Sequence, residues 1–195
     1  MEIVQSNANA MKIINCNDEA KSLLPWTFFY QQCEYIQSTW DQVIKSWAYI
    51  DSTWYRATVD FQITSTSKTD QCICWFYVDW SSFAYRVWYW QRDNFSSTQW
   101  VSSTSRQTAT WSTISSTYSS YQILIFAKQR YADWRYDSWA IAKLYSLQIY
   151  KNNVLVRDYV PVYRKSDNKP WLFDKTNKVF YVNEWSWDFT AWPDL

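Results

Sequence analysis

The feature that most constrains the fold is a regular alternation of apolar and polar residues with a period of two. The nine residues from Tyr55 to Ile63 show it most clearly. Because successive side chains of a strand point to opposite faces, this segment predicts a β-strand with one buried side. The apolar face would carry Tyr55, Ala57, Val59, Phe61 and Ile63, and the polar face Arg56, Thr58, Asp60 and Gln62.

Further segments rich in Val, Ile, Thr, Tyr, Phe and Trp predict more strands. They span residues 42–50, 71–78, 83–89, 121–127, 142–150, 154–162 and 179–183. Helical signals are few, and residues 18–24 and 131–138 each predict one short turn. Many short strands without alternating helices predict an all-β antiparallel sandwich or barrel. Sixteen of the 25 residues from 96 to 120 are Ser or Thr, which predicts either a long polar loop or a pair of solvent-facing strands.

Charge and composition exclude several classes of function. The formal net charge is +1, from 19 basic and 18 acidic side chains, so no field attracts nucleic acid or an anionic membrane. No apolar run reaches the roughly 18 residues of a membrane-spanning helix. The start of the chain lacks the pattern of a secretory signal. With no His, the chain has no His-based metal site and no Ser/His or Cys/His relay.

Two residue counts are abnormal together. Gly is absent, whereas average usage predicts about 14 in a chain of this length, and Trp occurs 16 times. Tight turns and bulges need positive φ angles, which Gly adopts at no steric cost. Residues that favour turns flank many of the tryptophans, among them Trp40, Trp54, Trp80, Trp134, Trp139, Trp185 and Trp187.

Several segments resemble the LamG-like, concanavalin-type jelly-roll domains of phage tail proteins and bacterial surface proteins. The closing strands of that family are similar to YSLQIYKN at 145–152, VLVRDYVPV at 154–162, LFDK at 172–175 and VFYVN at 179–183. The opening strands are similar to EYIQST at 34–39 and AYIDS at 48–52. The resemblance implies a jelly-roll β-sandwich over residues 27–195, preceded by an N-terminal arm over residues 1–26.

The same resemblance bears on the abnormal counts. The family pattern has Gly where this chain has Trp40, Trp54, Trp171, Trp185, Trp187 and Trp192, and also where it has Asn153, Asn168 and Lys178. An alternative genetic code that reads UGA as glycine would explain Trp at such positions. The other interpretation is literal, with the tryptophans forming a surface on which sugars stack. The first interpretation predicts that most of these residues lie in loops or at strand ends and are exposed.

The candidate catalytic and metal sites are weak. Glycoside hydrolases on related folds need two nearby carboxylates, usually two Glu on one strand face. Glu occurs only at positions 2, 19, 34 and 184, so no two share a strand and we expect no enzyme. Asp79 with Asp93 and Asn94, or Asp133 with Asp137, could instead hold Ca²⁺, but capping of turns is the simpler role and no cofactor is expected. Cys72 and Cys74 are two residues apart, which predicts both thiols on one strand face as small buried hydrophobes.

A carbohydrate site is the binding hypothesis for this chain. Lectins of this fold stack aromatic rings on sugars and fix the hydroxyls with Asp, Asn and Arg. The matching residues around one predicted strand and its following loop are Tyr85, Tyr89, Arg92, Asp93 and Asn94. The competing role for Tyr85 and Tyr89 is packing across strands.

Together these features predict a non-enzymatic virion protein, in a phage tail or appendage, that binds host-surface carbohydrate during adsorption. Its partners would be that glycan and other virion proteins, with a trimer as one arrangement. The arm would pair with another chain or attach the domain to a larger assembly. Two alternatives stay open: a purely structural capsid or tail protein that binds no sugar, and a domain of a bacterial surface adhesin.

Overall fold

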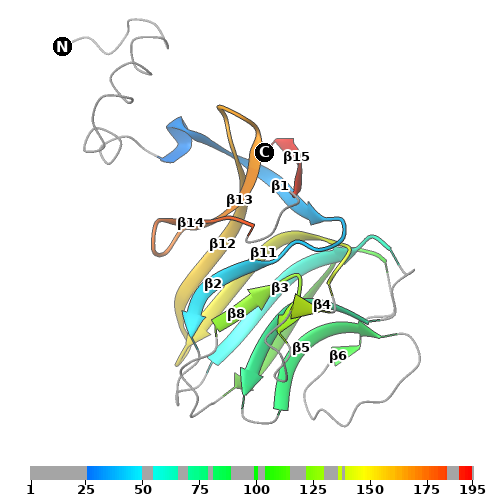
Figure 1. The fold of residues 1–195 in the computed structure, drawn as a ribbon. Coiled ribbons are helices and arrows are strands. Elements are labelled where there is room, and N and C mark those ends of the chain that lie inside the picture. Colours follow the sequence, from blue (N-terminus) through cyan, green and yellow to red (C-terminus); the bar gives the residue numbers. More distant parts are fainter. Residues whose placement is uncertain are drawn as a thin grey trace, which may run out of the picture.

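The protein is an all-β structure of two packed sheets (Figure 1). The computed structural model describes residues 26–49, 55–65, 70–78, 81–88, 99–100, 104–114, 122–129, 136–137, 139–183 and 189–194. In these residues the helical content is one 3-10 turn, η1 (Trp26–Phe28), so the all-β prediction is confirmed. Apart from Trp26, the predicted arm lies outside this part of the chain, and the boundary at residue 26 stays a prediction. No helix in the described segments is long and apolar enough to cross a membrane.

The larger sheet has the strand order β14-β13-β12-β1-β11-β3-β7, and β15 also pairs with β1. All its pairings are antiparallel. Its strands are β1 (Tyr30–Ser38), β3 (Tyr55–Ile63), β7 (Gln107–Ile114), β11 (Ala142–Lys151), β12 (Val154–Arg164), β13 (Lys169–Asp174), β14 (Val179–Tyr181) and β15 (Thr190–Asp194).

The second sheet has the order β2-β8-β4-β5-β6, antiparallel except for a short parallel contact between β5 and β6. Its strands are β2 (Ile44–Tyr49), β4 (Asp70–Val78), β5 (Ser81–Trp88), β6 (Gln99–Trp100) and β8 (Gln122–Ile125). A small hairpin joins β9 (Lys128–Gln129) to β10 (Tyr136–Asp137). The helical turn predicted at 131–138 is therefore wrong where the structure describes it, because residues 136 and 137 pair as a strand. The turn predicted at 18–24 lies outside the described residues.

Alternation predicts a strand well where only one of its faces is buried. The strand β3 has the predicted bounds, and its burial alternates along all nine residues. The other predicted strands are also present, displaced by a few residues at their ends. In the Ser/Thr-rich stretch, the described residues include two strands, β6 and β7, but these belong to different sheets and do not form the predicted pair.

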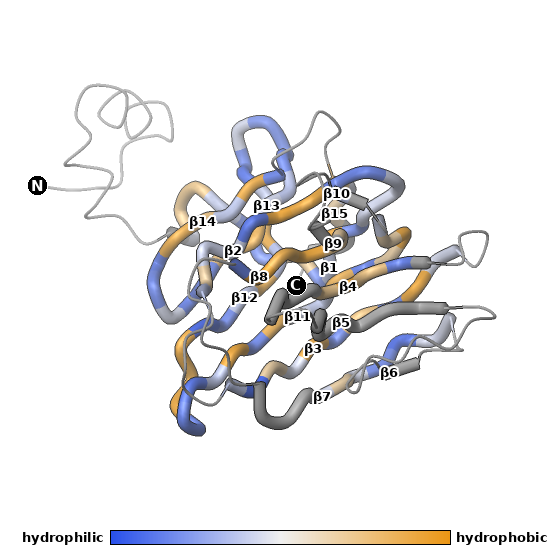
Figure 2. The backbone as a smooth tube through the Cα atoms, turned by 60° about the horizontal axis from the view of Figure 1, so that its bottom comes forward, coloured by the Kyte–Doolittle hydropathy of each residue, from blue (hydrophilic) through white to orange (hydrophobic). Residues whose placement is uncertain are grey.

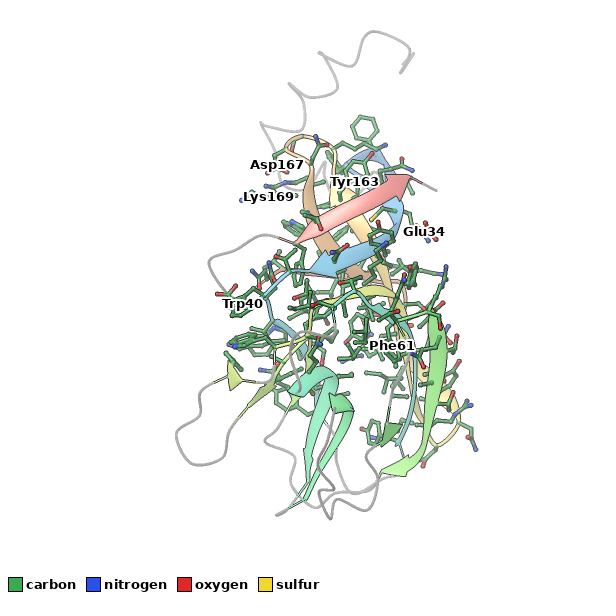
Figure 3. All side chains as sticks on the ribbon, turned by 90° about the vertical axis from the view of Figure 1, so that its right-hand side faces the viewer. Glu34, Trp40, Phe61, Tyr163, Asp167 and Lys169 are labelled. Atoms are coloured by element: carbon green, nitrogen blue, oxygen red, sulfur yellow. The ribbon has the colours of Figure 1, made fainter. Side chains whose placement is uncertain are left out.

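The main core lies between the two sheets. Figure 2 shows hydrophobic residues recurring along the strands that face one another, and Figure 3 shows Phe61 among the packed side chains. Phe61, Ile36 and Tyr159 are fully buried there. The Tyr159 hydroxyl donates a hydrogen bond of 3.1 Å to the carbonyl of Ser46, which joins the large sheet to β2. Burial raises the pKa of Tyr159.

Strand β1 holds the large sheet together because it pairs with three other strands. Tyr30 is opposite Arg164 of β12, and Ile36 is opposite Leu144 of β11. On its other edge, Ile36 is opposite Ala191 of β15. The strands at the centre of the sheet are thus contributed by both ends of the described chain.

A buried carboxylate closes the turn between β13 and β14. Asp174 has no solvent exposure, and its Oδ1 accepts hydrogen bonds from the backbone N–H groups of Asp158 and Thr176 at 3.1 and 3.0 Å. Its Oδ2 accepts one of 2.7 Å from the Asn177 amide and lies 3.6 Å from Nε of Arg157. Asp174 thus caps this turn, although the sequence made no prediction for this residue.

The two neighbouring cysteines of β4 correct one prediction. Cys74 belongs to the main core, whereas Cys72 belongs to a second cluster with Val43, Leu124 and Ala127. The pairing of β4 with β5 shifts register between Cys72 and Cys74, which is the signature of a β-bulge. The prediction of small buried residues is confirmed, but that of a shared strand face is wrong because the bulge intervenes.

Positive φ angles test the positions where the family pattern has Gly. Asn153, Asn168 and Lys178 have φ of 65°, 56° and 59°, so all three occupy the left-handed region that favours Gly. By contrast, Trp171 and Trp192 lie in paired strands without positive φ. At these two positions the expectation of a Gly conformation is wrong, because the strand continues through the residue.

Trp40, an exposed tryptophan in a loop, also lacks the Gly conformation that the family pattern suggests. Trp40 lies in a bend and is 61% exposed, as the recoding interpretation predicts, yet its φ is not positive. Trp171 and Trp139 are only partly exposed. The positions of Trp54, Trp185 and Trp187 lie outside the described residues.

One tryptophan that the family pattern did not single out does have the Gly conformation. Trp47 has φ of 50° and lies where the pairing of β2 with β8 shifts register between Lys45 and Tyr49. A large residue with positive φ is a steric outlier, and a bulge of this kind usually has Gly in that conformation. The Trp47 ring is 54% exposed.

Candidate functional site

The predicted carbohydrate site falls almost entirely outside the described residues. Tyr89, Arg92, Asp93 and Asn94 all do, and the backbone of Tyr85 lies in β5 opposite Cys74. Of Tyr85 only the backbone is described, so sugar binding by these five residues stays a prediction.

The strongest cluster of chemically active side chains lies instead on the outer side of the large sheet. We call it the polar face, and it consists of Glu34, Tyr35, Asp60, Gln62, Arg106, Lys143 and Tyr145. The alternation of β3 places Asp60 and Gln62 there, because their neighbours Val59, Phe61 and Ile63 point into the core. In Figure 3 the labelled Glu34 of β1 lies at the edge of the molecule, whereas Phe61 lies among the packed side chains.

Arg106 is the centre of the polar face. Its Nε and Nη2 donate to the two oxygens of Asp60 at 3.0 and 2.7 Å, and its Nη1 donates to Glu34 at 3.3 Å. The Arg106 side chain, just before β7, therefore reaches over β3 and β11 to β1. The hydrogen bond to Asp60 raises the pKa of Arg106, so its charge is permanent. The Arg106 side chain is 48% exposed, so each ion pair stabilises the fold by only about 1 kcal/mol or less.

The tyrosine rings of the polar face are covered by cations. The Arg106 guanidinium lies 3.7 Å from the centre of the Tyr145 ring, and the Lys143 ammonium lies 3.9 Å from that of Tyr35. The two rings meet edge to face at 5.5 Å. Cation–π contacts of this kind hold both partners in place. A sugar could therefore reach the polar atoms of this face directly, but it could stack on these rings only by displacing a cation.

Hydrogen bonds fix the polar atoms around Tyr145. Its hydroxyl donates to Oε1 of Gln62 at 2.9 Å, and the Gln62 amide donates to the carbonyl of Thr104 at 2.9 Å. Burial is the largest cause of the raised pKa of Tyr145. The polar face thus presents carboxylate, guanidinium, ammonium and amide groups in one fixed arrangement, which suits a ligand with many hydroxyl groups.

The metal sites considered from the sequence cannot be located in the described residues. In the residues with described positions, no group of three or more Cys, Asp or Glu side chains is placed to hold a metal. The predicted calcium residues Asp79, Asp93, Asn94 and Asp133 lie outside those residues, and only the backbone of Asp137 is described.

Sequence reasoning missed the polar face as a site. Alternation placed Asp60 on an exposed face, but nothing in the sequence indicates that Glu34 and Arg106 converge there. Strands β1 and β3 are separated by β11, so their meeting depends on the sheet order. The paired positions of Lys143 and Gln62 on β11 and β3 would have been the only local signal, once the register was known.

A second surface lies on the outer side of β12, β13 and β14. We call it the aromatic patch, and it consists of Tyr30, Val160, Val162, Trp171, Phe173 and Phe180. Tyr30 stacks on Phe180 with ring centres 3.8 Å apart, and the Arg164 guanidinium lies 5.2 Å from the Trp171 ring centre. The next turn carries Asp167, which Figure 3 shows together with Lys169 at the far end of the molecule from Phe61. Arg164 donates two hydrogen bonds to Asp167 and lowers the pKa of that carboxyl to about 2.

These features define an all-β protein with two mostly antiparallel sheets packed face to face, a polar face on the larger sheet and an aromatic patch at one end. Comparison with known proteins adds no narrower class: no family model, no curated protein and no solved structure matches the chain. The arrangement of sheets is compatible with a β-sandwich.

Proposed function

We propose that this protein is a non-enzymatic LamG-like jelly roll of a phage virion, and that it binds host-surface carbohydrate during adsorption. The observation that carries the proposal is the polar face. Glu34, Asp60, Gln62, Arg106 and Lys143 gather on one side of the large sheet, and hydrogen bonds and ion pairs hold them in position. Saccharides are recognised through such groups, because each hydroxyl both donates and accepts hydrogen bonds.

The polar face supports binding better than hydrolysis. Glu34 and Asp60 both form ion pairs with the Arg106 guanidinium. A glycoside hydrolase needs one carboxyl that stays protonated until it donates to the leaving group. The proposal therefore assigns Glu34 and Asp60 to hydrogen bonding with sugar and not to catalysis.

One observation favours the alternative of a structural virion protein that binds no sugar. The tyrosine rings of the polar face already have cations over them, so the most common contact in sugar recognition, ring stacking, is not open there. In that case the charged groups of the polar face would serve contact with neighbouring virion proteins.

An array of bacterial surface polysaccharides separates the two functions. We expect the wild-type protein to bind a subset of the array, and Arg106→Gln to weaken that binding at least tenfold, because Glu34 and Asp60 lose their shared partner. Arg164→Gln is the matched control, since it removes the same kind of charge at the end of β12, away from the polar face. Absence of wild-type binding across diverse polysaccharides would favour the structural role. Binding that survives Arg106→Gln would move the site away from the polar face.

The gene's neighbours test the virion part of the proposal. Tail or capsid genes on both sides would support it and exclude a bacterial adhesin. The codons for tryptophan should be read from the same nucleotide sequence, because UGA at position 47 would support an alternative genetic code and UGG would contradict it.

A further inference from the structure

Strand β2 turns two large aromatic side chains toward solvent on the side of the molecule opposite the polar face. It is an edge strand of the second sheet (Figure 1), and burial alternates along it. Ile44 and Ala48 belong to the main core, so Trp47 and Tyr49 lie on the outer side of the sheet. These two residues are 54% and 41% exposed. Two open rings on one face of a strand form a surface to which a partner can bind.

The backbone at Trp47 is held in a strained conformation. Its φ of 50° lies in the left-handed region, which is a steric outlier for a residue of this size. The pairing of β2 with β8 shifts register here, as in a β-bulge. Bulges re-aim side chains next to binding sites, and strained residues gather where a ligand is held. The outlier therefore indicates a role for the Trp47 ring that offsets its cost in stability.

Hydrogen bonds on both sides of Trp47 fix the bulge. The N–H of Trp47 donates to Oε1 of Gln122, and the N–H of Ala48 donates to the Ser46 hydroxyl, both at 3.1 Å. That hydroxyl donates to the carbonyl of Ile123 at 2.8 Å. Strain of this kind persists only where the surrounding contacts over-determine it. The Trp47 side chain thus projects from a rigid backbone, which lowers the entropy that a ligand must pay to order it.

The rings of β2 are open in a way that the rings of the polar face are not. Within the described part of the chain, neither Trp47 nor Tyr49 has a cation or a second ring against it. Gln122 lies opposite Tyr49 in the register and is partly exposed, so its amide is beside the rings. We call these three residues the β2 strip. A pyranose presents a face of C–H groups to an aromatic ring and its hydroxyls to neighbouring polar groups, and the β2 strip offers both kinds of contact.

The size of the β2 strip fits a small ligand and not a second copy of the chain. The exposed parts of Trp47 and Tyr49 add up to about 200 Å². A stable protein interface takes about 800 Å² from each partner. Lys45, the next outward residue of β2, is charged and lies 6.0 Å from the ring centre of Tyr136, which ends the strip on that side. The open area therefore suits a short stretch of a saccharide.

We propose that the β2 strip is a saccharide-binding site, with pyranose rings stacked on Trp47 and Tyr49 and a sugar hydroxyl bonded to the Gln122 amide. This site goes beyond the function proposed above, because it lies on the other sheet and uses no residue of the polar face. It also gives a reason for a tryptophan at a position where a bulge usually has Gly.

Trp47→Gly tests the site in a folded protein, because Gly suits the backbone of the bulge. On the polysaccharide array we expect it to weaken wild-type binding about tenfold or more, since it removes the larger of the two open rings. Trp47→Phe keeps a ring and should retain most of the binding. Trp40→Ala is the matched control, because it removes a tryptophan that is 61% exposed in the bend before β2, and it should leave binding unchanged.

The same array distinguishes this site from the polar face. Binding that is lost in Trp47→Gly and kept in Arg106→Gln would support the β2 strip alone. Binding that is kept in Trp47→Gly and lost in Arg106→Gln would overturn the β2 strip and leave the polar face. No wild-type binding to any polysaccharide would overturn both sites.

Two further results would overturn the proposal. One is an oligomer that dissociates in Trp47→Gly but not in Trp40→Ala when measured by sedimentation, with sugar binding unchanged, which would make the ring a contact between copies. The other is glycine at position 47 in the protein from its own source, measured by mass spectrometry, which would leave no ring for a sugar to stack on.

Discussion

Position 47 gives the sharpest test of how the chain accommodates its lack of glycine. Trp47 has φ of 50° in the bulge of β2, and its ring is 54% exposed. A side chain in the left-handed region costs about 1–2 kcal/mol, whereas Gly loses about 0.5–1 kcal/mol through its greater freedom in the unfolded chain. Both Trp47→Gly and Trp47→Ala remove the ring, so the difference between them isolates the backbone. We expect the Gly variant to be the more stable by about 0.5–1 kcal/mol.

Urea unfolding of the two variants measures this difference, and Tyr49 supplies the control. Tyr49 lies on the same strand, is 41% exposed and does not have a positive φ. There the order should reverse, with Tyr49→Ala more stable than Tyr49→Gly by about 0.5–1 kcal/mol. A Trp47→Ala variant as stable as Trp47→Gly would refute the claim that the bulge needs a residue without a side chain. Mass spectrometry of the protein from its own source would then show which residue the organism inserts at this position.

Three further predictions follow from single contacts. Asp174→Ala should lower the free energy of unfolding by about 2–4 kcal/mol in urea titrations, because it leaves buried N–H groups without an acceptor. The Asp167 carboxyl should titrate near pH 2 when followed by NMR, because Arg164 lowers its pKa. Its pairing with Arg164 is complete above the ordinary pKa of Asp and is lost as the pH falls toward 2. In Arg164→Gln the midpoint of this titration should return to the ordinary range of Asp. Tyr159→Phe should lower the free energy of unfolding by about 1 kcal/mol near neutral pH, because it removes the hydrogen bond to Ser46. Burial raises the Tyr159 pKa, so above a pH of about 10 the unfolded chain loses the hydroxyl proton first and the free energy of unfolding of the wild type should fall. The free energy of unfolding of Tyr159→Phe should fall less over the same pH range.

Local pattern predicted those parts of the fold that depend on one strand at a time. The bounds of β3 follow from alternation because its apolar face meets a single, continuous core. The start of β1 was missed because Gln31, Gln32 and Glu34 interrupt its apolar pattern, and these residues are tolerated by pairing with β12 and by exposure. Alternation also missed the segment of β13, which only the family resemblance at 172–175 indicated, since Pro170 and the turn residues before it obscure a short strand.

Contacts between distant strands could not be predicted in the same way. The shared partner of Glu34 and Asp60 is Arg106, and the three come together only because β11 lies between β1 and β3. The separation of Cys72 from Cys74 required a register shift that leaves no mark on the sequence. Gly positions were predicted correctly where the chain reverses, as at Asn168, and wrongly where a strand continues, as at Trp171.

The threefold pairing of β1 has a consequence for how the protein folds. Ile36 is synthesised long before its neighbours Leu144 and Ala191 are made. Until then, both edges of this strand are open to other chains, and closing such long loops is slow. Refolding in milliseconds to seconds, with a tendency to aggregate while synthesis is incomplete, is the behaviour this topology implies.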